Sequence, residues 1–396
     1  MRLIRPIACL RPKREYVQQL LAPPYDVINM EEARRFVEGR PFNLLHLTKP
    51  EIDLPEGCEP YGSDVYAQAK TNYRKLLKAG VLIQETEPCY YLYRLTQGLH
   101  RQTGLVAAGS VEAYQAQRIR RHELTHPDKV EDRAALLKAL NCHVSPVLLA
   151  FKSNQVMEGL LEESTREVPL YSVNMDHSVR HELWRVDRAE LIEALTLAIE
   201  EIGVLYIADG HHRVAAAAQV TEACLAVLFP VSELSILGYY RIVRDLNGHS
   251  KQDLLQRLNT HFKVSMSPSA VIPSKKSHYG MYLEGQWYAL ELISELPSGN
   301  VLASLEVSLL SQTLLEPLFN ITDPRVDPKI SFIGGQEGIS KLKAEIDSGR
   351  GAVGFTLFPT SMEELIKVAD AANIMPPKST WFEPKLADGL ILLPIN

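Results

Sequence analysis

A short apolar segment, five polar residues and an alanine-rich segment follow one another in the middle of this chain. Val204–Ala208 is typical of a buried strand, and Val214–Gln219 strongly favours a helix. Asp209-Gly-His-His-Arg213 must therefore turn the chain from a strand into a helix. A glycine in such a turn lets the backbone approach a ligand closely, and the first N–H groups of the helix then face that ligand. The pattern predicts an anion site at residues 209–213.

Each side chain of this turn suggests a role. Arg213 is suited to fork onto phosphate oxygens, and His211 and His212 add hydrogen-bond donors beside Gly210. Asp209, at the end of the strand, is placed to hold a metal ion or to orient one of the histidines. The structural alternative is that Asp209 only caps the helix while the other side chains are solvated.

A second polar segment lies upstream. Arg118–Val130 contains His122-Glu123-x-x-His126, which matches the zinc-peptidase pattern. We reject zinc proteolysis, because Pro127 prevents a helix from running through the motif and no further motif announces a third ligand. Glu123, among arginines and histidines, is interpreted as a functional carboxylate near an anion site. The alternative is a solvated charged surface.

A third segment, Met375–Lys385, is stiffened by prolines. Lys378, Ser379 and Thr380 offer an ammonium group and two hydroxyls, which suit a carboxylate or a phosphate. The neighbouring Trp381 and Phe382 are expected in the core.

Helical and strand patterns interleave along the chain, which indicates a mixed α/β (α+β) fold. Helices are expected at Ser63–Lys78, Asp187–Ile202, Gln252–Phe262 and Met362–Ala372. Strands are expected at Cys89–Thr96, Gly104–Tyr114, Leu225–Phe229, Tyr240–Val243 and Gly351–Phe358, with a hairpin over Tyr279–Leu292. The segment 265–277 is rich in Pro, Ser and Lys, so we place a boundary there, between an N-terminal region at 1–264, which holds the expected anion site, and a C-terminal region at 265–396, which holds the Lys378–Thr380 segment. The alternative is that 265–277 is only a loop.

Composition excludes several classes of protein. A formal net charge of −6 disfavours nucleic-acid binding, and we expect no nucleic-acid partner. The 5 cysteines lack CxxC spacing, which indicates reduced thiols rather than a disulfide framework or a structural zinc site. Because Arg5 and Pro6 interrupt the apolar N-terminal stretch and no segment is long enough to span a bilayer, we expect a cytoplasmic protein without a membrane partner.

Six motifs that keep their order over nearly the whole chain resemble the bacterial family known as domain of unknown function 1015. They are Ala22–Val27, His122–Thr125, Ala208–Arg213, Arg244–Gly248, Asp323–Arg325 and Met375–Lys385. The family name conveys no activity.

A more distant resemblance does imply one. Asp-Gly-His-His-Arg after a strand is similar to the motif of the archaeal free-serine kinases, members of the ParB/sulfiredoxin-like superfamily, which phosphorylate free L-serine with a nucleotide and magnesium. Those kinases also carry an upstream His-Glu, whose Glu acts as the base, and a Pro-Lys-Thr-Thr segment near the C-terminus. The corresponding positions here are His122-Glu123 and Pro377-Lys-Ser-Thr380. The resemblance implies a ParB/sulfiredoxin-like core with additional N- and C-terminal elements.

The same superfamily frames two rival functions. Sulfiredoxins place a nucleophilic Cys where this chain has His211, so thiol chemistry has no nucleophile here. ParB proteins bind CTP and carry a helix-turn-helix, of which we find no convincing example.

Our hypothesis is a kinase that makes O-phosphoserine from free L-serine with ATP or ADP and Mg²⁺. Glu123 is predicted as the base, Asp209 as the catalytic and metal-binding carboxylate, and Gly210–Arg213 as the nucleotide site. Lys378, Ser379 and Thr380 are predicted to hold the substrate. The alternative is a ParB-like, nucleotide-binding regulatory protein without transfer activity.

Overall fold

The computed structural model describes residues 2–175, 179–293 and 299–395, and the chain forms two compact units. Unit 1 comprises Met1–Leu234 and Pro384–Asn396, and unit 2 comprises Ser235–Glu383. Unit 2 is therefore inserted into unit 1 shortly before the C-terminus.

The boundary that we expected between residues 264 and 265 falls inside unit 2. Ser265 pairs with Ala289 in a strand ladder, and the carbonyl of Val271 accepts a hydrogen bond of 2.7 Å from Thr356 Oγ1. The polar segment 265–277 is thus the end of one strand and the loop to the next, rather than a linker between units.

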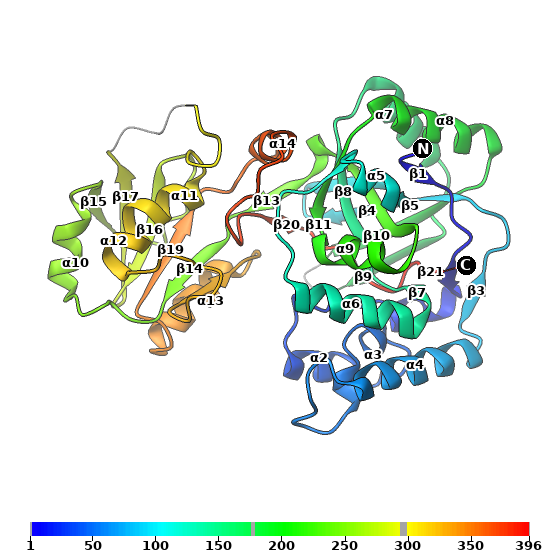
Figure 1. The fold of residues 1–396 in the computed structure, drawn as a ribbon, viewed down its shortest axis with the longest axis horizontal. Coiled ribbons are helices and arrows are strands. Elements are labelled where there is room, and N and C mark those ends of the chain that lie inside the picture. Colours follow the sequence, from blue (N-terminus) through cyan, green and yellow to red (C-terminus); the bar gives the residue numbers. More distant parts are fainter. Residues whose placement is uncertain (1, 176–178, 294–298, 396) are drawn as a thin grey trace. The chain divides into compact units, whose positions relative to one another are not determined.

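A nine-stranded mixed sheet forms the centre of unit 1 within the described residues (Figure 1). Its order is β6-β11-β8-β12-β5-β4-β10-β9, and β1 pairs with β5. β8 and β12 are parallel, as are β6 and β11, whereas the β4–β5 hairpin is antiparallel. The strands are β1 (Ile4–Arg5), β4 (Tyr90–Gln97), β5 (His100–Ser110), β6 (Ile119–Arg120), β8 (Val147–Phe151), β9 (Tyr171–Met175), β10 (Val179–Val186), β11 (Leu205–Asp209) and β12 (Ala223–Pro230).

Within the described residues, five helices contribute to the hydrophobic core of this sheet: α5 (Val111–Gln115), α6 (Pro127–Leu140, through Leu137), α7 (Gln155–Ser164), α8 (Ala189–Ile202) and α9 (His211–Val220). On α8, Leu191, Leu195 and Ile199 recur at helical spacing and are buried, as the sequence predicts. The helix ends at Gly203, whose φ of 77° is a left-handed conformation that glycine adopts without strain.

A layer of N-terminal helices forms a second core with α6 (Pro127–Leu140), which packs between α4 and α9 (Figure 1). In α2 (Met30–Phe36), Asn29 and Glu32 form a reciprocal cap at the beginning of the helix. The remaining elements of unit 1 are α1 (Val17–Leu20), α2 (Met30–Phe36), α3 (Leu45–Thr48), α4 (Ser63–Lys78), the 3₁₀ helices η1 (Arg14–Tyr16), η2 (Pro50–Asp53) and η4 (Val231–Glu233), and the strand pairs β2 (Leu10–Pro12) with β3 (Leu82–Gln84) and β7 (Cys142–His143) with β21 (Leu393–Pro394).

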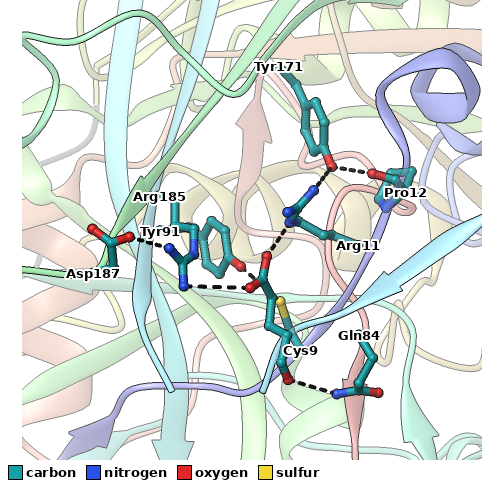
Figure 2. Close-up of polar contacts among 9 residues, drawn as sticks. Cys9, Arg11, Pro12, Gln84, Tyr91, Tyr171, Arg185 and Asp187 are labelled. Atoms are coloured by element: carbon teal, nitrogen blue, oxygen red, sulfur yellow. Dashed lines mark hydrogen bonds and ion pairs between the residues drawn. The ribbon is translucent and has the colours of Figure 1, made fainter. Parts of the chain in front are cut away.

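A largely buried polar cluster ties the N-terminal segment to the sheet (Figure 2). Arg11 donates to Tyr171 Oη over 3.1 Å and pairs with Glu85, which also lies 3.5 Å from Arg185. Cys9 Sγ donates to Tyr91 Oη over 3.4 Å, and burial raises the pKa of this thiol to about 12. The five cysteines of the chain are free, so the cluster is held by hydrogen bonds and ion pairs.

Unit 2 is built on an antiparallel sheet, which has six strands within its described residues, in the order β15-β17-β16-β19-β14-β18. Tyr240, Ile242, Tyr282 and Trp287 from this sheet form a core with α13. The elements of unit 2 are β13 (Ser235–Leu237), β14 (Tyr240–Val243), α10 (Lys251–Leu258), β15 (Phe262–Ser267), β16 (His278–Leu283), β17 (Gln286–Leu292), α11 (Glu306–Leu310), the π-helix η5 (Ser311–Leu315), α12 (Glu316–Phe319), β18 (Ile330–Ile333), α13 (Gly338–Asp347), β19 (Val353–Leu357), α14 (Met362–Asp370) and β20 (Trp381–Glu383).

The mixed α/β class is confirmed, and the expected elements are found with two local corrections. The segment 104–114 is a strand only as far as Ser110, whose side chain accepts a hydrogen bond from Ala113 N (3.1 Å) and begins α5. The helix expected over 252–262 ends at Leu258, and Phe262 already starts β15. The ParB/sulfiredoxin-like core stays a prediction. The helices of the described part of the chain are all too short or too polar to cross a bilayer.

Candidate functional site

The predicted anion site lies where β11 leads into α9. Gly210 joins them with φ 97° and ψ 31°, a conformation that favours glycine. A Cβ at this position would lie 2.9 Å from Arg213 Nε, so a side chain here would force the Arg213 guanidinium to move. The first N–H groups of any α-helix lack acceptors within the helix, and those of α9 follow directly on this turn. The expected strand–turn–helix arrangement is confirmed.

The His122–His126 segment is bonded to the beginning of α9. The backbone N–H of His122 donates to His211 Nε2 over 3.4 Å, and the N–H of His126 donates to His212 Nε2 over 3.1 Å. The His122 and His211 rings also meet edge to face, with centroids 4.5 Å apart. The zinc-peptidase pattern therefore precedes α6, which begins at Pro127, instead of lying on a helix.

These bonds fix the state of His211. Its Nε2 accepts a hydrogen bond, so the ring proton of the neutral imidazole is on Nδ1. Nδ1 lies 3.5 Å from Glu123 Oε2. Burial lowers the pKa of His211 to about 3, so the ring is neutral at pH 7 and its contact with Glu123 is not an ion pair. The Glu123 side chain keeps 31% of its surface exposed and is open to a substrate.

Asp209 is paired with two cations. Its Oδ2 lies 2.9 Å from Lys385 Nζ, and its Oδ1 lies 3.5 Å from Arg213 Nη2. Burial raises the pKa of this carboxyl, but Lys385 and Arg213 outweigh burial and hold the pKa well below its usual range. Asp209 is therefore an ionised carboxylate at pH 7, and it lies just before the beginning of α9.

Arg213 points back into unit 1. Its guanidinium donates to the carbonyl of Pro146 and to Asp209, and its side chain keeps only 13% of its surface exposed. The nearby carboxyl groups of Asp26 and Asp388 also raise the pKa of the Arg213 guanidinium. The guanidinium therefore neutralises carboxylates of the fold, and its predicted role as a phosphate fork stays a prediction.

A small cavity of about 40 Å³ adjoins Arg213, and its polar lining includes Tyr25, Arg133, His143, Ser145 and Arg213. Arg133 stacks its guanidinium over the Tyr25 ring, 4.0 Å from the centroid. Ser145 Oγ donates over 2.8 Å to Asp388, which is 1% exposed, and burial raises the pKa of Asp388 to about 7.

Sequence reasoning missed several of these groups. Lys385 closes the third motif and was noted only as part of it. Tyr25 lies in the Pro-marked segment 22–27, which we quoted only for the family resemblance. Asp388 stands alone before Gly389 and carried no signal, because a single Asp-Gly pair normally indicates only a turn.

The three predicted substrate residues belong to unit 2. Lys378 has a φ of 56°, and its Nζ lies 5.5 Å from the centroid of the Tyr239 ring. Ser379 is buried, its Oγ donates to the carbonyl of Pro376 over 2.6 Å, and its own carbonyl accepts from Thr360 Oγ1 over 2.9 Å. The Ser379 hydroxyl therefore holds the turn closed. Glu123 and residues 209–213 are brought together in unit 1.

The site does not contain a preformed metal cage. Within residues 2–175, 179–293 and 299–395, no group of three or more His, Cys, Asp or Glu side chains is arranged to hold a metal ion. Asp209, the predicted ligand, is engaged by Lys385 and Arg213. These residues do not fit a metal that is bound mainly by protein side chains.

Comparison with known proteins gave solved structures and one family. The chain is similar to free serine kinase in complex with AMP, at 14% identity over 74% of this chain and 91% of that chain, with a TM-score of 0.37. The chain is also similar to a mutant of free serine kinase in complex with ADP, at 14% identity over 74% of this chain and 92% of that chain, with a TM-score of 0.38. The similarity to SbnI with C-terminal truncation from Staphylococcus aureus is 11% identity over 72% of this chain and 85% of that chain, with a TM-score of 0.38.

No curated protein matches the chain. The family described as protein of unknown function (DUF1015) matches residues 4–308, which is most of the chain. The chain therefore belongs to the DUF1015 family.

Proposed function

We propose that this protein is a small-molecule kinase that transfers a phosphoryl group from ATP or ADP to the hydroxyl of free L-serine. The observation that carries the proposal is the position of Glu123. Its carboxylate lies at the beginning of α9, 3.5 Å from His211 Nδ1, and is partly open to solvent. A carboxylate beside a backbone anion site is the arrangement that phosphoryl transfer to a hydroxyl requires.

The nucleotide phosphates would lie against the turn at Gly210 and the first N–H groups of α9. The absence of a side chain at Gly210 allows the close approach, and the helix dipole favours negative charge at this end. His211 and His212 contribute through their backbone N–H groups, because their Nε2 atoms accept bonds from the 122–126 segment. Such positioning of phosphates supplies most of the catalysis in phosphoryl transfer.

Glu123 would accept the proton of the serine hydroxyl. As the proton leaves, the serine oxygen forms a bond to the transferred phosphorus, and the bridging P–O bond to the nucleotide breaks. The electron pair of that bond goes to the departing nucleotide phosphate. A positioned base of this kind contributes about 10²–10⁴-fold to the rate. The neutral His211 keeps the carboxylate aimed without protonating it.

Mg²⁺ normally accompanies nucleotide phosphates and binds through them and one or two carboxylates. Asp209 is paired with Lys385 and Arg213, and its predicted role as a metal ligand stays a prediction. The predicted binding of the serine carboxylate by Lys378, Ser379 and Thr380 also stays a prediction. Of these three, Lys378 has an exposed side chain, so Lys378→Met is its direct test through the KM for serine.

The proposal is tested by incubating the purified full chain with ATP or ADP and Mg²⁺, with and without L-serine, and detecting O-phosphoserine by mass spectrometry. We expect product only when serine is present. Glu131→Gln, an exposed carboxyl on α6, is the matched control for Glu123→Gln and should leave product formation unchanged. A protein that is stabilised by nucleotide but makes no phosphoserine would instead be a nucleotide-binding regulatory protein.

A further inference from the structure

The side chains of the 209–213 turn that we predicted to bind phosphate make hydrogen bonds within unit 1. The Nε2 atoms of His211 and His212 accept backbone hydrogen bonds, and the Arg213 guanidinium donates to the Pro146 carbonyl and to Asp209. Backbone N–H groups carry only partial charges, so a side chain with a full positive charge beside the turn would strengthen the binding of phosphates.

Lys385 brings an ammonium group to this turn. Its Nζ lies 2.9 Å from Asp209 Oδ2, at the residue that immediately precedes Gly210. The Lys385 side chain keeps 19% of its surface exposed, and that of Asp209 keeps 29%. The pair is therefore sheltered but reachable from solvent, unlike the more buried Arg213 guanidinium at 13%.

The backbone that carries Lys385 is fixed in unit 1. The N–H of Ala387 donates to Tyr93 Oη over 3.2 Å. Asp388 and Ala22 then exchange two backbone hydrogen bonds, of 2.9 and 3.0 Å. Lys385 thus sits three residues before an anchored strand bridge, which limits where its ammonium can reach.

We propose that Lys385 is the phosphate-binding cation of this site and that Asp209 positions its ammonium group. An ammonium has three N–H donors, so it can donate to Asp209 and to a phosphate oxygen over the beginning of α9 at the same time. In this arrangement Asp209 positions the Lys385 ammonium group and does not serve as a metal ligand. This inference rests on the proposed nucleotide site and identifies Lys385 as the residue that recognises the negative charge of the phosphates.

The test measures binding of adenosine, AMP and ADP to the full chain by calorimetry. Lys385→Met should weaken ADP binding by about 10- to 100-fold, the loss of one charge-assisted hydrogen bond, and should leave adenosine binding within about twofold. Lys385→Arg, which keeps the charge, should recover part of the affinity. Lys70→Met, an exposed lysine on α4, should change nothing.

A second variant covers the case in which Lys385→Met fails to fold. Asp209→Asn keeps the ammonium but removes its charged partner, and should weaken ADP binding while sparing adenosine. The inference is overturned if Lys385→Met binds ADP as the wild type does, if it loses adenosine and ADP equally, or if the wild type binds none of the three ligands. A wild type that binds ADP through Lys385 but makes no phosphoserine would uphold this inference and refute the kinase.

Discussion

Asp388 is the buried carboxyl that makes the stability of unit 1 depend on pH near neutrality. It is 1% exposed, it accepts a hydrogen bond of 2.8 Å from Ser145, and it lies in the field of Arg213. Burial raises its pKa from 3.8 to about 7, although Arg213 and Ser145 lower it. At about 1.4 kcal/mol for each pKa unit, this shift corresponds to about 4 kcal/mol.

The sign follows from proton binding. Between about pH 4 and pH 7 the folded protein holds this proton and the unfolded chain does not, so the contribution of Asp388 to stability falls as the pH rises through that window. Asp388→Asn keeps the size and the acceptor for Ser145 but cannot ionise. The difference in stability between the variant and the wild type should be smallest near pH 4, should grow with each pH unit above it, and should level off above pH 7, where the variant is the more stable by about 4 kcal/mol.

The assay is hydrogen exchange of peptides from β5 and β12, at the centre of the unit 1 sheet, at pH 5, 6, 7 and 8 after correction for intrinsic rates. Buried histidines also make stability depend on pH, because burial lowers their pKa values in the folded chain. They are common to both proteins, so the difference between variant and wild type isolates Asp388. Asp64→Asn, an exposed residue on α4, is the control and should show no pH-dependent difference. A difference for Asp388→Asn that stays constant from pH 5 to pH 8 would refute the reasoning.

Two further substitutions test the turn and its support. Gly210→Ala should destabilise unit 1 by at least about 1–2 kcal/mol in urea titrations, because φ is 97° and the new Cβ would lie 2.9 Å from Arg213 Nε. Gly159→Ala, in the open on α7, should instead be slightly stabilising, and equal effects would contradict this account. His211→Asn should release Glu123 and slow phosphoserine formation by about 10- to 100-fold while ADP affinity changes less than threefold; a parallel loss of both would mean that His211 only stabilises the fold.

Local patterns predicted the elements of this chain well, because strong periodicity and clear caps coincide there. The helix expected over Ser63–Lys78 is α4 with the same bounds. The hairpin of β16 and β17 turns at Glu284 and Gly285, both with positive φ, as an acidic-glycine turn favours. Errors arose where two elements follow each other without a loop, as at Ser110, whose side chain caps α5 directly after β5.

The division into units was not predictable from composition. The chain enters unit 2 at Ser235 and returns at Pro384, and neither point has a marked linker. The segment 265–277 has linker composition, but a loop between two strands needs the same polar residues and prolines. Composition indicates that a segment is exposed to solvent. It does not distinguish a loop within one unit from a linker between two units.

The candidate site was predicted in part. The sequence paired Glu123 with the 209–213 turn, and the structure brings them together through His211. It assigned the histidines and Arg213 to the ligand, whereas their ring nitrogens and guanidinium bond to the protein. Such bonds join residues far apart in sequence, and a single sequence does not register them. Lys385 was missed for the same reason.

The most direct test of the kinase is a single-turnover comparison of wild type and Glu123→Gln, with ADP or ATP, Mg²⁺ and L-serine, alongside nucleotide affinities measured on the same preparations. A base that acts in the transfer step should cost about 10²–10⁴-fold in the rate of phosphoserine formation when it is removed, with nucleotide affinity held within about threefold. Equal rates in the two proteins, or a wild type that forms no phosphoserine, would contradict the proposed function.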